Sequence, residues 1–275
     1  ILSVAVMANG AGADRSEYIT PESPNITVGS NGDNTSIQSA INDSETESGD
    51  IILVKDSYDP SQDDSITINK SVTLAAESID TTINVSGSAQ DSAGISVQAS
   101  EVTIEGFVIN GVPAANYSEA DSDSKYTINV NASEFTVKSC FFKVNSDEKG
   151  KGAVEIEKGN ENIVFNNSIV SNYGWGITAR ENVNNLTVKN SEFNPTYFRE
   201  TGTNNFIGAG VQLWSGDGTE IKNNEFHGAK DQIDDFESAA EDEDASINMY
   251  AFTDFGSYFF DKTAQQTVQN NVVEG

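Results

Sequence analysis

The chain has 275 residues, of which 43 are Asp or Glu and only 15 are Lys or Arg, so its formal net charge is −28. Binding a phosphate backbone needs clustered Lys and Arg, and this balance therefore argues against nucleic acid and against an anionic membrane surface as partners. A folded chain this acidic is typical of a protein that works in concentrated salt, where the Debye length is about 3 Å at 1 M. We expect a salt-loving, archaeal source.

The first 34 residues show no regular period. Ile1 to Ala8 is apolar, and the following stretch to Asn34 is rich in Gly, Ser, Asn, Pro and acids. An apolar run of eight residues is too short for a bilayer, which takes about 20 residues. It fits a signal-peptide remnant or a strand that pairs with a neighbouring molecule. We treat residues 1–34 as an irregular leader with a candidate assembly arm, and residues 35–275 as one domain.

Regular structure is expected from residue 35 onward. Apolar residues at helical spacing predict a short helix from Ser36 to Ile41, with Thr35 or Ser36 as its N-cap. Such a helix can cover the open end of a stack of strands. Alternating apolar residues then predict short strands at Ile51–Val54, Ile66–Ile68 and Val72–Leu74.

One short pattern recurs six times: an apolar residue, two positions later Asn, Gly or Ser, and three positions after that another apolar residue. Each copy predicts a strand, a tight turn and a strand, as in a solenoid. The copies begin at Ile104, Val137, Phe165, Val188, Ile221 and Val268, and upstream strands are expected at Ile95, Ile128, Val154, Ile177, Val211 and Ile247 with Met249. Polar inserts at residues 113–125, 145–151, 195–205 and 231–245 are expected to be loops that leave the solenoid.

Residues 35–275 resemble the right-handed parallel β-helix proteins of the pectate-lyase-like and NosD-type groups. The resemblance rests on the helix followed by Gly49-Asp-Ile-Ile-Leu-Val54, on the two strands around Asn69-Lys70, and on repeats such as Val102 to Asn110. It implies an all-β fold, a single-stranded right-handed parallel β-helix with a short N-terminal capping helix. The same coil occurs in lyases, hydrolases, adhesins and structural proteins, so it does not imply one function.

Four Asn residues occupy the same position of the repeat. In stacked coils they would lie about 4.8 Å apart, where their amides can hydrogen-bond to one another, and Asn tolerates the left-handed conformation of a tight turn. We therefore expect a structural ladder formed by Asn167, Asn190, Asn223 and Asn270.

The chain contains nine Asn-X-Ser/Thr sequons without Pro, whereas its composition would give roughly five by chance. This excess favours a secreted glycoprotein, located outside the cell or on its surface. The candidate glycosylation sites are Asn25, Asn34, Asn42, Asn69, Asn84, Asn116, Asn131, Asn166 and Asn185.

Basic catalytic groups are scarce, since the chain has three Arg and one His. The β-helix resemblance implies, for an enzyme, either acidic calcium ligands with an Arg or Lys base or paired Asp carboxylates with a His nearby. The candidates are Asp231, Asp234 and Asp235, with His227 and Arg180 on the same face. Because adjacent acids are common by chance in this chain, we expect no catalysis at this cluster.

Two groups of residues could bind a ligand, one a sugar and the other calcium. Trp175 and Trp214 would form a sugar-binding platform if they project from one face, or else they cover turns. Acidic loops at Asp121–Asp123 and Asp231–Asp235 offer oxygen ligands for calcium, although neither follows a calcium-loop pattern. No other cofactor is expected.

Apolar residues stand at both ends of the chain. Ile1, Leu2, Val4 and Val6 at one end and Val272 and Val273 at the other are candidate contacts between copies assembled head-to-tail. Our leading hypothesis is a noncatalytic extracellular subunit of a filament or surface layer, formed by N-terminal strand donation. The alternatives are a polysaccharide-active lyase or hydrolase and a carbohydrate-binding adhesin with glycan partners.

Overall fold

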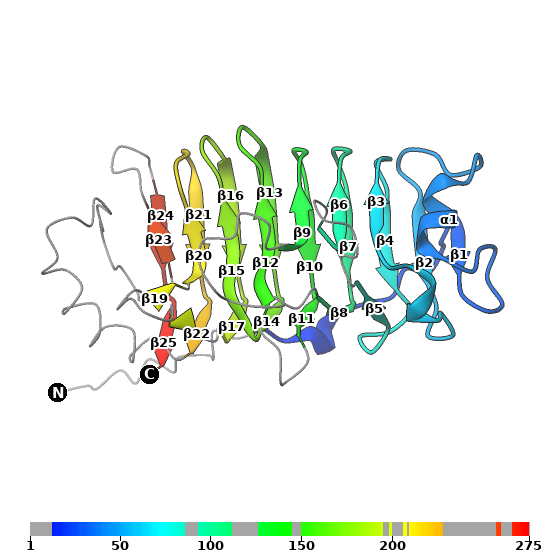
Figure 1. The fold of residues 1–275 in the computed structure, drawn as a ribbon, viewed down its shortest axis with the longest axis horizontal. Coiled ribbons are helices and arrows are strands. Elements are labelled where there is room, and N and C mark those ends of the chain that lie inside the picture. The colour runs from blue at the N-terminus through cyan, green and yellow to red at the C-terminus, as the bar shows by residue number, and fades with distance from the viewer. Residues whose placement is uncertain are drawn as a thin grey trace, which may run out of the picture.

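The computed structural model describes residues 13–85, 93–111, 126–144, 150–194, 198–199, 206–207, 209–227, 257–259 and 266–274. These residues form three parallel sheets and one antiparallel pair of short strands. From residue 73 onward the chain passes through the three sheets in turn and returns to the first, one strand per sheet in each complete coil. The coils stack along the long axis of the molecule (Figure 1). The fold is a right-handed parallel β-helix, as expected from the repeats.

We name the sheets A, B and C. Sheet A runs through β1 (Ile26–Val28), β2 (Ile51–Val54), β4 (Thr73–Ala76), β7 (Thr103–Glu105), β10 (Thr136–Lys138), β13 (Glu161–Asn166), β16 (Asn184–Lys189), β21 (Thr219–Lys222) and β24 (Gln266–Gln269). Sheet B runs through β3 (Ile66–Ile68), β6 (Ile95–Val97), β9 (Tyr126–Val130), β12 (Gly150–Ile156), β15 (Tyr173–Ala179), β20 (Ala209–Leu213) and β23 (Ser257–Phe259). Sheet C runs through β5 (Thr82–Asn84), β8 (Val108–Asn110), β11 (Phe141–Lys143), β14 (Ile169–Ser171), β17 (Glu192–Asn194), β22 (Glu225–His227) and β25 (Val272–Glu274).

The core consists of columns of apolar side chains from equivalent positions of successive coils. In sheet A, Ile104 lies beside Val137, and Phe165 lies beside Val188, all at most 2% exposed. Stacked Phe side chains fill the space between the sheets, with Phe193 and Phe226 5.1 Å apart at their ring centroids. Period-two alternation within three- to seven-residue strands places these residues inside and the polar residues outside.

The N-terminal end of the stack is covered by α1 (Ile37–Asn42), as predicted, and Ser36 is its N-cap. The buried carboxylate of Asp63 accepts hydrogen bonds from the backbone N–H groups of Ile37 (2.7 Å) and Gln38 (3.0 Å). Helix α1 therefore buries its apolar face on the first coil and has its first N–H groups satisfied. Among the described residues, no helix is long and apolar enough to cross a membrane.

The expected boundary at residue 34 differs from the structure. Strand β1 pairs with β2 and is the first strand of sheet A, so residues 26–28 belong to the β-helix. The preceding residues 13–20, which include the 3₁₀ helix η1 (Arg15–Glu17), lie outside the solenoid and cross several coils. Figure 1 shows this dark-blue segment beside β8 and β11. We call residues 13–20 the N-terminal strap.

Hydrogen bonds fix the strap to one coil after another. Asp14 exchanges two 2.7 Å hydrogen bonds with the side chain of Asn167. Arg15 donates to the carbonyl groups of Ile79, Gly106, Phe107 and Ser139 at 2.7 to 3.1 Å. Tyr18 donates through its hydroxyl to the Ala76 carbonyl (2.7 Å). Burial lowers the pKa of the Arg15 guanidinium and raises the pKa of the Tyr18 hydroxyl.

The turn from sheet A to sheet C is nearly the same in every described coil from β7 onward. Its central residue has a positive φ, from 50° to 55° at Asn167, Asn190, Asn223 and Asn270. Ser139 (53°) and Gly106 (86°) occupy the same position earlier in the chain. The continuous amide ladder expected at these Asn residues does not form. Asn223 donates to Asn190 (3.4 Å), but Asn190 donates to Asn166 (3.1 Å) and Asn167 donates to Ser139 (3.2 Å).

The regular polar ladder lies one residue later and inside the solenoid. Backbone N–H groups there donate to the side chain of the next coil, from Cys140 to Ser168, from Ser168 to Ser191, from Ser191 to Asn224 and from Asn224 to Asn271, at 2.9 to 3.2 Å. Ser168, Ser191 and Asn224 are fully buried. The left-handed residue turns the next side chain inward, so the sequence pattern located the turn but not the ladder.

The turn from sheet C to sheet B varies in length. Between β14 and β15 it consists of Asn172 alone, with φ 67°. Every insert noted in the sequence connects a strand of sheet C to the next strand of sheet B. One insert contributes the antiparallel pair β18 (Phe198–Arg199) and β19 (Phe206–Ile207). Among the described residues, the last strand of sheet B is β23, and the segment Ile247–Met249, where a strand was expected, lies outside them.

Candidate functional site

The central strands of sheet B are longer than the others, and their outer face is polar. β9, β12, β15 and β20 have five to seven residues, whereas β3, β6 and β23 have three. One outward row runs in register across them, from Asn129 through Glu155 and Thr178 to Gln212. Each row position has a buried apolar residue on either side, which fixes this direction.

Glu155 is the centre of a charged network on this face. Its Oε1 atom accepts a 2.8 Å hydrogen bond from Nε of Arg180, and Nη2 of Arg180 also donates to it. Asn129 donates to Oε2 of Glu155 (3.3 Å) and to Oε1 of Glu157 (2.8 Å). Burial lowers the pKa of Arg180, but the hydrogen bond and the charge of Glu155 outweigh burial and leave this pKa raised. This ion pair keeps the guanidinium charged.

Trp214 lies beside this network. The Arg180 guanidinium lies over the ring of Trp214, with Cζ 5.1 Å from the ring centroid. Trp175 belongs to β15, three positions before Thr178, and is partly exposed. The sugar-binding platform formed by both Trp residues stays a prediction.

A second polar chain completes the face. The Tyr126 hydroxyl donates to Oγ1 of Thr178 (3.0 Å), and Thr178 donates to Oε1 of Gln212 (3.4 Å). The ring of Tyr126 lies where a Cβ atom on Gly152 would be, so Gly152 makes room for it. We call the surface formed by Asn129, Glu155, Arg180, Gln212 and Trp214 the sheet B face.

The structure separates residues that the sequence placed on one face. Arg180 directly follows β15 in sheet B, whereas His227 ends β22 in sheet C. The expected grouping of Arg180 with His227 is therefore wrong, because the two lie in different sheets. Asp231, Asp234 and Asp235, and the loop Asp121–Asp123, lie outside the described residues. Glu155 was missed because its Arg180 partner is 25 positions away in the sequence.

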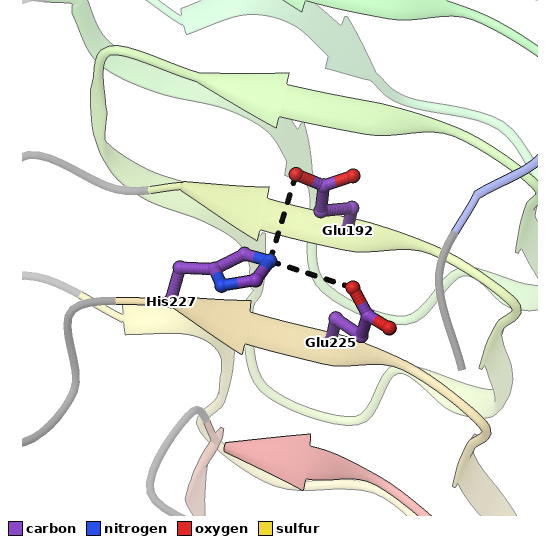
Figure 2. Close-up of side chains that lie close together, drawn as sticks. All are labelled: Glu192, Glu225 and His227. Carbon is purple, nitrogen blue, oxygen red and sulfur yellow. Dashed lines mark ion pairs between the residues drawn. The ribbon is translucent and has the colours of Figure 1, made fainter. Parts of the chain in front are cut away.

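His227 lies instead beside two glutamates of sheet C (Figure 2). Its Nε2 atom is 3.6 Å from Oε1 of Glu192 and 3.5 Å from Oε2 of Glu225. All three side chains are partly exposed. Oxygen and imidazole ligands converge here, so this is the position in the described residues that could hold a metal ion.

The structure describes most of the predicted glycosylation sites and part of the predicted assembly contacts. Among the sequons, the Asn side chain is exposed at Asn25, Asn42, Asn69, Asn84, Asn131 and Asn185, and it is half-buried at Asn34 and Asn166, while Asn116 lies outside the described residues. Ile1, Leu2, Val4 and Val6 also lie outside them. Val272 and Val273 belong to β25, the edge strand of sheet C.

Comparisons with known proteins agree with this architecture. No protein-family model matches the chain, and no curated protein matches it. The chain is similar to a solved structure of pectin methylesterase from Aspergillus niger in deglycosylated form, with 15% identity and a TM-score of 0.51 over 93% of this chain and 87% of that chain. The same enzyme in penultimately deglycosylated form gives 14% identity and a TM-score of 0.48 over the same shares. At 15% identity the likeness shows the β-helix fold alone.

Proposed function

We propose that this protein acts on a polysaccharide outside the cell and binds it on the sheet B face. The observation that supports the proposal is the network of Trp214, Arg180, Glu155 and Asn129, in which a partly exposed aromatic ring lies beside hydrogen-bonding groups. Sugar rings stack on aromatic faces while their hydroxyl groups bond to polar side chains. The solved structures that share this fold are of an enzyme named for pectin, which is a polysaccharide.

The position of the inserts supports the same face. Every insert enters sheet B at the start of a strand, so all of them border the sheet that carries the network, although Glu155, Arg180 and Trp214 lie at the other ends of the strands. Binding and catalytic residues are commonly presented by variable loops on a rigid scaffold. The opposite turn, from sheet A to sheet C, has two residues in every described coil from β7 onward and five residues, 77–81, between β4 and β5.

Glu155 is the candidate reacting group. A carboxylate positioned by an Arg can act as a nucleophile or general base toward an ester or a glycosidic bond. Glu157, which shares Asn129 with it, provides a second carboxylate. The net charge of −28 repels polyanions, so we expect a neutral or esterified polysaccharide as the substrate.

A binding and turnover assay tests this function. The purified protein is incubated with neutral polysaccharides and with pectins of high and low methyl esterification, and affinity, released methanol, reducing ends and unsaturated ends are measured. Trp214→Ala and Glu155→Gln should each weaken binding at least about tenfold, which corresponds to about 1.4 kcal/mol. Glu155→Gln should also abolish turnover.

Glu105→Gln is the matched control for Glu155→Gln. Glu105 also pairs with a cation on a neighbouring coil, Lys138, and its side chain is 13% exposed, as is that of Glu155, but it lies in sheet A. Binding by Glu105→Gln should equal that of the unmodified protein. If Glu155→Gln and Trp214→Ala bind every polysaccharide as well as Glu105→Gln does, the sheet B face is not the binding site.

A noncatalytic filament subunit is the second candidate. Among the described elements, no strand pairs with the outer edges of β23, β24 and β25, and an open edge can accept a strand from another molecule. Helix α1 covers the other end, so bare coils cannot stack there without moving it. Electron microscopy of the full chain and of a variant lacking residues 1–8, both in high salt, tests strand donation: fibres that persist after the deletion contradict it.

A further inference from the structure

We infer that Glu192, Glu225 and His227 form a binding site for a divalent transition-metal ion such as Zn²⁺. Glu192 and Glu225 lie directly opposite each other on β17 and β22, and His227 follows Glu225 by two positions on the same face. Figure 2 shows the three side chains pointing toward one another across the two strands. The site lies in sheet C and does not depend on the function proposed for the sheet B face.

The spacing of the ligand atoms fits a shared ion. Nε2 of His227 lies 3.5 and 3.6 Å from the two carboxylate oxygens, and all three atoms lie within 4.8 Å of one another. These contacts are longer than ordinary hydrogen bonds. A tetrahedral ion with bonds of about 2.0–2.1 Å places its ligands roughly 3.4 Å apart, so small side-chain movements would close the site around it.

The row to which the two glutamates belong is otherwise free of charge. In register across sheet C it contains Thr82, Val108, Phe141, Ile169, Glu192, Glu225 and Val272. Carboxylates occur at two adjacent coils only, where like charges opposite each other are unfavourable. Within the described residues, neither glutamate pairs with a Lys or an Arg. A bound cation would offset this repulsion.

Neighbouring groups hold the ligands in place. Nδ2 of Asn194 donates to Oε1 of Glu192 (2.8 Å) and orients that carboxylate. Between the ligands, Phe193 and Phe226 stack in the core and fix the two strands side by side. An imidazole with two carboxylates suits Zn²⁺ and its neighbours in the first transition row, whereas Ca²⁺ and Mg²⁺ prefer oxygen ligands alone. Three protein ligands leave a fourth position for water.

Titration of the chelator-treated full chain with Zn²⁺ alone tests this site. The titration is done in about 1 M NaCl, where diffuse attraction to the acidic surface is screened. We expect saturable binding of one ion, at least about 100-fold weaker in His227→Ala and at least about tenfold weaker in Glu192→Gln and in Glu225→Gln. Ca²⁺ should not compete. Zn²⁺ should raise the midpoint of thermal unfolding of the unmodified protein but not of His227→Ala.

Glu220→Gln is the matched control, because Glu220 belongs to the same coil but pairs with Lys222 in sheet A. Its Zn²⁺ affinity should be unchanged, and circular dichroism without metal should show that every variant is folded. The inference is overturned if the unmodified chain shows no saturable binding, if His227→Ala binds Zn²⁺ equally well, or if Glu220→Gln weakens binding as much as Glu192→Gln does.

Discussion

Two turns of the same coil differ in almost every respect. From β7 onward, the turn from sheet A to sheet C has one left-handed residue in each described coil, lies over the buried Ser and Asn ladder, and is crossed by the N-terminal strap. The turn from sheet C to sheet B ranges from Asn172 alone to long inserts. Packing and hydrogen bonding therefore constrain the turn at one edge of the solenoid, whereas the length of the turn at the other edge is free to vary.

Loss of Arg15 should lower the free energy of unfolding more than any other change described below. Arg15→Ala removes a charged donor shared by four carbonyl groups of three coils, and we expect the free energy of unfolding to fall by about 3 kcal/mol. Urea denaturation measures it. The control, Glu17→Ala, alters an exposed residue of the same 3₁₀ helix and should change the free energy by less than about 0.5 kcal/mol. Equal midpoints for the two variants would show that the strap adds no stability.

Substitution in the buried ladder should lower the free energy of unfolding nearly as much. Asn224→Ala leaves the Ser191 N–H group and the Val188 carbonyl without their partner, at a cost of about 2–3 kcal/mol. Asn190→Gly, at the outer position, keeps the left-handed backbone and should cost less than about 1 kcal/mol. A cost at Asn190 as large as at Asn224 would contradict the assignment of the ladder to the interior.

A pair of glycines isolates the contact between the strap and the solenoid. Gly106 (φ 86°) and Gly159 (φ 79°) both have left-handed backbones, but a Cβ atom on Gly106 would lie 2.6 Å from the Tyr18 ring, while a Cβ atom on Gly159 would meet nothing within 4 Å. We expect Gly159→Ala to cost about 1 kcal/mol and Gly106→Ala about 2 kcal/mol or more. Thermal unfolding of both variants measures the difference, which should vanish in Tyr18→Ala.

The smallest effect on stability is expected at the variable turn. Replacing residues 195–206 with a single Asn would copy the connection at Asn172 and should change the free energy of unfolding by less than about 1 kcal/mol, because loop-closure entropy depends weakly on length. Polysaccharide binding should nevertheless fall, since this insert enters β20, the strand that carries Gln212 and leads to Trp214. A variant that unfolds at much lower urea would show that this turn is as constrained as the other.

The candidate sites could not be read from local sequence. Glu155 and Arg180 are 25 positions apart, and they meet because the two lie on adjacent coils. The cluster of Glu192, Glu225 and His227 depends likewise on the register between β17 and β22. His227 was recognised as a candidate, but its partners were sought among the following Asp residues rather than one coil back. In a solenoid, side chains on neighbouring strands are separated in the sequence by one whole coil. Because inserts change the number of residues per coil, this separation is not constant along the chain.

Local sequence patterns predicted the strands of a solenoid, the capping helix at Ser36 and the left-handed turns at Asn167, Asn190, Asn223 and Asn270, because apolar alternation and turn residues act over a few positions. The resemblance to β-helix proteins added the parallel β-helix, and the left-handed residues Glu101, Glu134 and Asn172 were not predicted. Three features depend on tertiary contacts: residues 26–28 begin sheet A, the strap crosses the coils, and the polar ladder lies inside the solenoid. The tertiary structure also decided which side chains meet on sheets B and C. Those contacts join positions far apart in the chain, and their partners are set by the stacking of whole coils.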